Sequence, residues 1–196
     1  TVLTGVLPNA LVNLRKSLPL LHVKVSCGSS STLVERVKQG AIDVAVISKP
    51  PIDYPDLKWT AFEKEPLVVI APMNSPDQSA ESLLRNNPFI RFNRSAWVGG
   101  MIVEYLKDQD IKVNDIMELS TLEAVRTMVF HGLGVSVIPY RTAQYPHTLP
   151  VKTLSFSTKA PERILGIIEK EGNSKSHLTQ VLLDELSTSG GKPQIL

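Results

Sequence analysis

The tripeptide Ser-Thr-Leu occurs twice in this chain, and each copy opens the same pattern. Residues 31–33 lead into a helical segment that ends near Gly40, just before the apolar run 42–47. Residues 120–122 lead into a helical segment that ends at Gly132, just before the apolar run 135–139. A helix, a glycine stop and a buried strand, repeated in this order, are typical of an α/β fold. The repeat therefore favours two similar α/β lobes.

Each copy also carries the spacing of a helix capping box, in which a hydroxyl residue is followed three positions later by glutamate. Thr32 stands before Glu35, and Ser120 stands before Glu123. We predict that Thr32 and Ser120 cap the two helices. The first turn of a helix has unpaired N–H donors and a partial positive charge, so it suits a carboxylate or another anion. Two such turns that face one cleft would bind a small molecule, and ordinary helix capping is the alternative explanation.

The remaining pattern alternates helices with strands. Four leucines at helical spacing, from Leu7 to Leu18, predict a helix that Pro19 ends. Alternation over 22–27 predicts a strand with Cys27 buried, and the continuous apolar run 42–47 predicts a strand buried on both faces of a parallel sheet. Further strands are predicted within 66–71, 88–92, 116–119, 135–139, 151–154 and 163–168, and further helices near 80–85, 102–106 and 175–186.

Composition excludes several classes of protein. The chain has 196 residues, 42% of them hydrophobic and 20% charged, which is enough for a packed core in two small lobes. Its net charge of +2 is not concentrated in a basic window, so these residues are poor candidates for contacting DNA directly. No apolar run approaches the roughly 20 residues of a membrane span, so we expect no membrane partner. A single cysteine forms no internal disulfide, which fits the cytoplasm without excluding the periplasm.

The chain offers no readable catalytic or metal motif. It lacks G-x-S-x-G and H-E-x-x-H, and Gly132-Leu133-Gly134 lacks the third glycine of a dinucleotide fingerprint. Its four histidines are scattered along the sequence. We therefore expect no enzyme, no cofactor and no metal site.

Four segments, together with Leu7-Pro8 and the leucine helix that contains them, resemble the effector-binding domain of LysR-type transcriptional regulators. The four segments are residues 28–33 (Gly-Ser-Ser-Ser-Thr-Leu), 40–46 (Gly-Ala-Ile-Asp-Val-Ala-Val), 65–71 (Glu-Pro-Leu-Val-Val-Ile-Ala) and 128–139 (Met-Val-Phe-His-Gly-Leu-Gly-Val-Ser-Val-Ile-Pro). The second and fourth segments, in this order and spacing, are the most specific part of the resemblance. It covers nearly the whole chain.

The resemblance implies two Rossmann-like lobes joined by two crossover strands, as in type 2 periplasmic binding proteins. Lobe I would comprise 1–62 plus 164–196, and lobe II would comprise 63–163. In this family a winged helix-turn-helix precedes the domain, and the short stretch before the first helix here leads us to expect a missing upstream portion. The resemblance further implies a homodimer or homotetramer in the cytoplasm, with DNA bound only through that N-terminal domain. The first helix of one copy would lie against a helix of lobe II in the other.

By the same resemblance, a small-molecule effector lies between the lobes and shifts the geometry of the oligomer. The residues carried over are Thr4 at the start of the first helix, Ser30 and Ser31 before the second helix, and Arg91, Arg94, Ser95 and Thr121 from lobe II. Hydroxyls, helix starts and a guanidinium suit an anion, and Arg94 is the favoured charge partner ahead of Arg91. Leu3, Val6 and Trp97 would suit an aromatic acid equally well.

Two other functions remain open from the sequence. A periplasmic solute-binding protein for an amino acid or an oxyanion would have a similar fold, but it would normally be monomeric. An enzyme on a two-lobed scaffold would need catalytic carboxylates or arginine clusters that the sequence does not display. A measurement of oligomeric state would distinguish a solute-binding protein from a regulator, and substrate turnover would reveal an enzyme.

Overall fold

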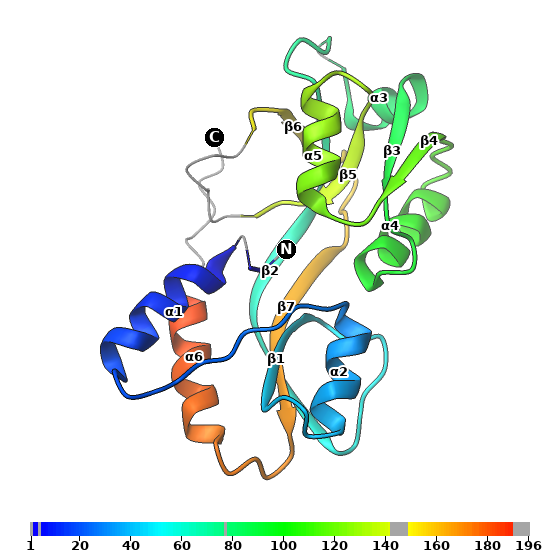
Figure 1. Ribbon diagram of the computed structural model, residues 1–196. Coiled ribbons are helices and arrows are strands. Elements are labelled where there is room, and N and C mark those ends of the chain that lie inside the picture. The colour runs from blue at the N-terminus through cyan, green and yellow to red at the C-terminus, as the bar shows by residue number, and fades with distance from the viewer. Residues whose placement is uncertain (1, 4, 77, 142–148, 190–196) are drawn as a thin grey trace. The chain divides into compact units, whose positions relative to one another are not determined.

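The computed structural model describes residues 2–3, 5–76, 78–141 and 149–189 (Figure 1). Helices and strands alternate along much of the chain, which confirms the predicted mixture of α and β structure. The described residues divide into two compact units. Unit 1 contains Glu65–Tyr140 and residues 149–163, and unit 2 contains Val2–Lys64 and residues 164–189. Two strands, β2 (Leu57–Ala71) and β7 (Glu162–Lys170), contribute residues to both units.

Within the described ranges, unit 2 contains β1 (Val44–Ser48), most of β7 and the N-terminal part of β2, in the sheet order β1-β7-β2, together with three helices. Strand β1 pairs with β7, and helix α1 (Val6–Ser17) packs beside α6 (Ser176–Ser189) (Figure 1). The third helix of this unit is α2 (Ser30–Lys38). Its core contains Val6, Leu7, Ala10, Ile167 and Leu186. The predicted leucine stripe is confirmed, because Leu7 and Leu14 are buried and Leu11 packs against this core.

Unit 1 contains an antiparallel sheet and a parallel strand pair. The C-terminal half of β2 pairs with β5 (Ser136–Pro139) and with β6 (Lys152–Leu154). Strand β3 (Pro88–Phe92) runs parallel to β4 (Asn114–Leu119). Around these strands lie α3 (Ala80–Asn86), α4 (Trp97–Asp108) and α5 (Leu122–Phe130) (Figure 1). Fully buried apolar side chains from both strand groups, including Val69, Phe89 and Val137, form one core.

Two strand predictions in unit 2 are wrong. Residues 22–27 form no ladder within the described part of the chain, and Val23, Val25 and Cys27 are exposed. An alternating sequence becomes a strand only when a neighbouring backbone supplies its hydrogen bonds, which local pattern cannot reveal. Strand β1 begins only at Val44, runs antiparallel to β7 and buries alternate residues. It is therefore not the parallel strand, buried on both faces, that the apolar run predicted.

The two helix caps are displaced from their predicted positions. Ser29 caps α2 by accepting a hydrogen bond from the Thr32 N–H at 3.2 Å, so Ser30 and Ser31 are the first two helical residues and do not precede the helix. Thr121, one residue after Ser120, caps α5. In both cases the capping residue has an extended backbone, which aims its oxygen at the free N–H groups of the first turn. The S/T-x-x-E spacing located each helix start to within a turn but not the cap itself.

Candidate functional site

The parallel strands β3 and β4 end side by side in unit 1. The Asn93 N–H, just after β3, donates to the Leu119 carbonyl at the end of β4 at 2.9 Å. The loop 93–95 then leads into α4, and residues 120–121 lead into α5. Because both strands point the same way, the two helix starts follow from the same edge of the strand pair (Figure 1). Ligands of open α/β sheets bind outside the carboxyl ends of parallel strands, which makes this edge the candidate site.

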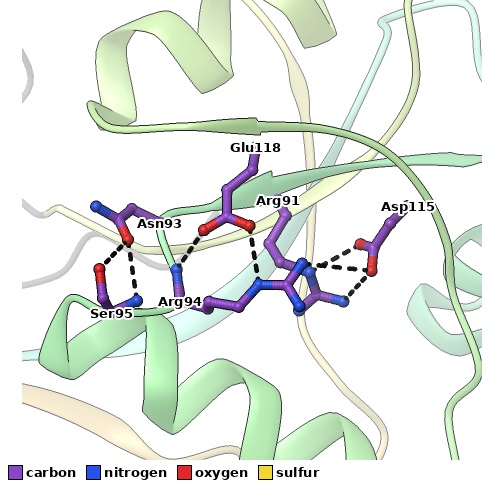
Figure 2. Close-up of polar contacts among 6 residues, drawn as sticks. All are labelled: Arg91, Asn93, Arg94, Ser95, Asp115 and Glu118. Atoms are coloured by element: carbon purple, nitrogen blue, oxygen red, sulfur yellow. Dashed lines mark hydrogen bonds and ion pairs between the residues drawn. The ribbon is translucent and has the colours of Figure 1, made fainter.

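The loop 93–95 is held in shape by its own side chains. The Asn93 Oδ1 atom accepts from the Ser95 N–H at 2.9 Å and from the Ser95 hydroxyl at 2.6 Å (Figure 2). The loop also lies directly on α4, because an ideal Cβ built on Gly99 would be 1.9 Å from the Asn93 carbonyl oxygen. Only a glycine at position 99 allows the loop backbone to approach the helix this closely.

The two helices that begin at this edge differ in their caps. The Thr121 hydroxyl oxygen accepts from the Ala124 N–H at 3.1 Å, so it satisfies one donor of the first turn of α5. The N-cap of α4 is Ala96, and no side chain caps this helix. The first turn of α4 therefore presents backbone N–H donors that no side-chain cap satisfies, beside the Ser95 hydroxyl. N–H donors at a helix start suit a carboxylate or another small anion, whereas the Ser95 hydroxyl in this structure donates its proton to Asn93 Oδ1.

Arg91 is engaged in a structural ion pair. Its Nε and Nη2 atoms each donate to the Asp115 carboxylate at 2.8 Å, and only 9% of its side chain is exposed (Figure 2). This two-point pair joins β3 to β4. A guanidinium that is buried and bound in this way has little freedom to take a second anion.

Arg94 is the more accessible arginine, with 56% of its side chain exposed. Its Nε donates to one Glu118 oxygen at 2.8 Å, and its backbone N–H donates to the other at 3.0 Å (Figure 2). The backbone bond from Arg94 is the main reason that the pKa of Glu118 is lowered, and the Arg94 side chain adds to the effect although desolvation opposes it. Glu118 therefore stays ionised at neutral pH and offsets the positive charge of Arg94.

The predicted site residues fall in two groups. The structure brings Arg91, Arg94, Ser95 and Thr121 together around the ends of β3 and β4 in unit 1. Ser30 and Ser31 lie in unit 2, where the Ser31 hydroxyl is 2.9 Å from the Ser29 hydroxyl. Thr4 lies outside the described residues.

Sequence reasoning missed the carboxylates and the amide that organise this edge. Asp115 and Glu118 bind the two arginines, and Asn93 shapes the loop. A signal existed for the carboxylates, because acidic residues occur in and beside the predicted strand 116–119. The pairing itself depends on the register of β3 against β4, which is not a local property of either segment. Across the described ranges, no cluster of three or more histidine, cysteine, aspartate or glutamate side chains could hold a metal ion.

Comparison with known proteins identifies the family. The family model described as the LysR substrate binding domain matches residues 1–190. The HTH-type transcriptional activator CmpR of Synechocystis sp. is 26% identical over 193 residues, which cover 95% of this chain and 63% of CmpR. The chain thus spans less than two thirds of the length of that curated relative.

Two solved structures share the fold. The regulatory domain of CcmR from Synechocystis PCC6803, in complex with 2-PG, superposes with a TM-score of 0.78 at 21% identity, over 94% of this chain and 91% of CcmR. The effector binding domain of QuiR, in complex with shikimate, gives a TM-score of 0.76 at 18% identity, over 93% of this chain and 89% of QuiR. These similarities confirm the predicted type 2 periplasmic-binding-protein-like fold. The family match over nearly the whole chain shows that it belongs to the LysR substrate-binding domain family.

Proposed function

We propose that this chain is the effector-sensing part of a DNA-binding transcriptional regulator, and that a small anionic effector binds at the start of α4. The observation that carries the proposal is the N-terminus of α4, which has no side-chain cap and follows the end of parallel strand β3. The α4 N–H groups and the Thr121 hydroxyl would bind the anion without themselves titrating, and the Ser95 hydroxyl would join them by turning its proton from Asn93 Oδ1 to the anion. Arg94 would complete the site by turning part of its exposed guanidinium from Glu118 to the effector.

The relatives support this assignment. CcmR is solved with 2-PG and QuiR with shikimate, which carries a carboxylate. CmpR is named a transcriptional activator, which favours a regulator over a periplasmic solute-binding protein. No helix in the described part of the chain is long and apolar enough to cross a membrane. On the basis of the family and its named relatives, we propose a cytoplasmic regulator without catalytic activity, which contacts DNA through a separate domain and acts as a homodimer or homotetramer.

The mechanism we propose is a shift of population between arrangements of the two lobes, with lobe I at 1–62 plus 164–196 and lobe II at 63–163. Thr4, Ser30 and Ser31 would contribute the unit 2 side of the site. An effector that contacts both lobes stabilises the arrangement in which both sets of contacts form, and it does so by its difference in affinity for the two arrangements. In an oligomer that shift would change the spacing of the DNA-binding domains.

The test is a thermal-shift screen with two matched cap variants. Small carboxylates such as shikimate, aromatic acids, amino acids and inorganic oxyanions serve as probes, and binding raises the melting temperature in a concentration-dependent way. Thr121→Ala removes the α5 cap and a proposed ligand hydroxyl together. Ser79→Ala removes the cap of α3, whose Oγ accepts from the Ser82 N–H at 3.1 Å, and leaves the candidate site intact.

Both variants should melt earlier than the wild-type chain, because loss of an N-cap costs about 0.5–2 kcal/mol. Only Thr121→Ala should also lose the ligand-induced rise. Equal ligand-induced rises in the two variants would remove Thr121 from the site, and the absence of any rise with every probe class in the wild-type chain would contradict the proposed site.

A further inference from the structure

Unit 2 contains a cavity that is separate from the candidate site. It has a volume of about 220 Å³ and lies where the loop after β1 meets the start of β2. Residues that line it include Lys49, Asp53, Tyr54, Leu57, Trp59 and Ile168. All of them belong to unit 2, so the cavity exists within one compact unit.

The apolar wall of the cavity is closely packed. Ile168 lies in the middle of β7 and is 1% exposed. The Trp59 ring lies directly on the β7 backbone, because a Cβ built on Gly166 would be 2.5 Å from its Cε2 atom. The ring therefore packs against a strand that has no side chain at that point. Leu57 adds further apolar surface to the lining.

The polar groups of the cavity are uncommitted. Lys49 and Asp53 are exposed residues at the rim of the cavity, and neither charged group has a hydrogen-bond or ion-pair partner within the described ranges, so both are available to a ligand. The Trp59 Nε1 atom is buried and has no hydrogen-bond partner in the described part of the chain. Buried donors are normally satisfied, so an unpartnered donor on a residue that lines the cavity is consistent with a ligand or a solvent molecule there.

We infer that this cavity is an accessory site for a zwitterionic amino acid with an apolar side chain. The ligand carboxylate binds the Lys49 ammonium, and the ligand ammonium binds the Asp53 carboxylate. The ligand side chain packs on Trp59, Leu57 and Ile168. The volume lies below the roughly 300–1,000 Å³ of sites for drug-sized ligands, so it selects a molecule about the size of a single amino acid.

The chain has two tryptophans, one near each site, and this separates the two binding events. Trp59 lines the cavity, and Trp97 is the first residue of α4. Trp97→Phe leaves Trp59 as the reporter of the cavity, and Trp59→Phe leaves Trp97 as the reporter of the α4 site. L-leucine, L-isoleucine and L-phenylalanine are the probes, with excitation restricted to tryptophan. We expect a saturable change in Trp59 emission in Trp97→Phe and none in the Trp97 emission of Trp59→Phe.

Charge variants in the Trp97→Phe background test the assigned contacts. Lys49→Met and Asp53→Asn should each weaken binding by at least about tenfold, because each removes a hydrogen bond to a charged group. Lys58→Met, at an exposed β2 residue outside the cavity lining, should leave the affinity unchanged. 4-Methylpentanoate, which lacks the amine of leucine, should bind as weakly as L-leucine binds to Asp53→Asn.

Several results would overturn the inference. The first is a lack of saturable change in Trp59 emission with all three amino acids. The second is equal affinity for 4-methylpentanoate and L-leucine. The third is a loss of affinity in Lys58→Met as large as that in Lys49→Met or Asp53→Asn. If Trp97→Phe does not fold, calorimetric titration of L-leucine into the wild-type chain and into Lys49→Met measures the same binding, and equal affinities or an absence of binding heat would overturn the inference equally. The readout does not depend on the α4 site, so failure of one proposal leaves the other standing.

Discussion

Adjacent glycines in α4 have different surroundings. A Cβ on Gly99 would be 1.9 Å from the Asn93 carbonyl oxygen, whereas a Cβ on Gly100 would meet its nearest atom, the Arg94 carbonyl oxygen, at 3.8 Å. The first distance is a backbone clash, and the second is an ordinary van der Waals contact. At the scale of single residues, therefore, Gly99 is required for the geometry of the candidate site and Gly100 is not.

Opposite effects on stability should follow from alanine at these two positions. Gly99→Ala should lower the free energy of unfolding by about 1–3 kcal/mol, because the loop 93–95 must move away from the helix. Gly100→Ala should raise it by about 0.5–1 kcal/mol, because alanine favours the helix and restricts the unfolded chain. Urea unfolding of both variants measures the difference, and a loss of equal size at both positions would refute the close-packing argument.

At the scale of elements, helix starts and strands were predictable to different degrees. The hydroxyl cluster 29–32 offers several residues that could cap α2, and only the backbone of Ser29 has the extended conformation that the cap requires. Segment 88–92 was predicted at its observed limits, because β3 is buried on both faces and bounded by a proline and an asparagine. Residues 22–27 had the pattern of a strand and lack a partner in the described structure.

Alanine variants of the two candidate capping residues test the assignment for α2. Ser29→Ala should cost about 0.5–2 kcal/mol of unfolding free energy, because it removes the acceptor of the Thr32 N–H. Thr32→Ala, inside the first turn and exposed, should change stability by no more than about 0.5 kcal/mol. Thermal unfolding followed by circular dichroism compares them, and a larger loss in Thr32→Ala would restore the cap that the sequence predicted.

The candidate site was predictable only in part, for the same physical reason. The resemblance placed Arg91, Arg94, Ser95 and Thr121 on one lobe, and the structure brings them together in unit 1. The partners of both arginines depend on β4 lying parallel beside β3, a contact across more than twenty residues of sequence. Hydrogen-bond partners at that separation are set by packing, so no local pattern reveals whether a guanidinium is free or bound.

At the scale of the whole molecule, one buried ion pair joins the two strands that contribute to both units. The Arg163 Nε of β7 donates to the Glu65 carboxylate of β2 at 2.6 Å, and each side chain is 3% exposed. Both residues lie at the limits of unit 1, next to the points where β2 and β7 continue into unit 2. Within unit 1, β2 and β7 are therefore joined by a charge pair that is almost fully shielded from water.

Breaking this pair should be far more costly than breaking a surface pair. Glu65→Gln should lower the free energy of unfolding by about 3–5 kcal/mol, because it removes the buried negative charge that the Arg163 Nε contacts. Asp43→Asn breaks the exposed pair with Lys175, 55% and 62% exposed, and should cost no more than about 1 kcal/mol. Urea unfolding of both variants provides the comparison. Similar losses would show that the Glu65–Arg163 pair contributes no more to the free energy of unfolding than an exposed pair does.

Because Cys27 is exposed, a dye attached to its thiol can report a distance within the chain by energy transfer from tryptophan. Cys27 is the one cysteine in the sequence, so a thiol-reactive dye attaches to the chain at a single point in unit 2. In the Trp59→Phe variant, Trp97 of unit 1 is the sole tryptophan donor for energy transfer to that dye. Transfer efficiency with and without an effector then turns the proposed movement of the lobes into a change of distance between two defined residues.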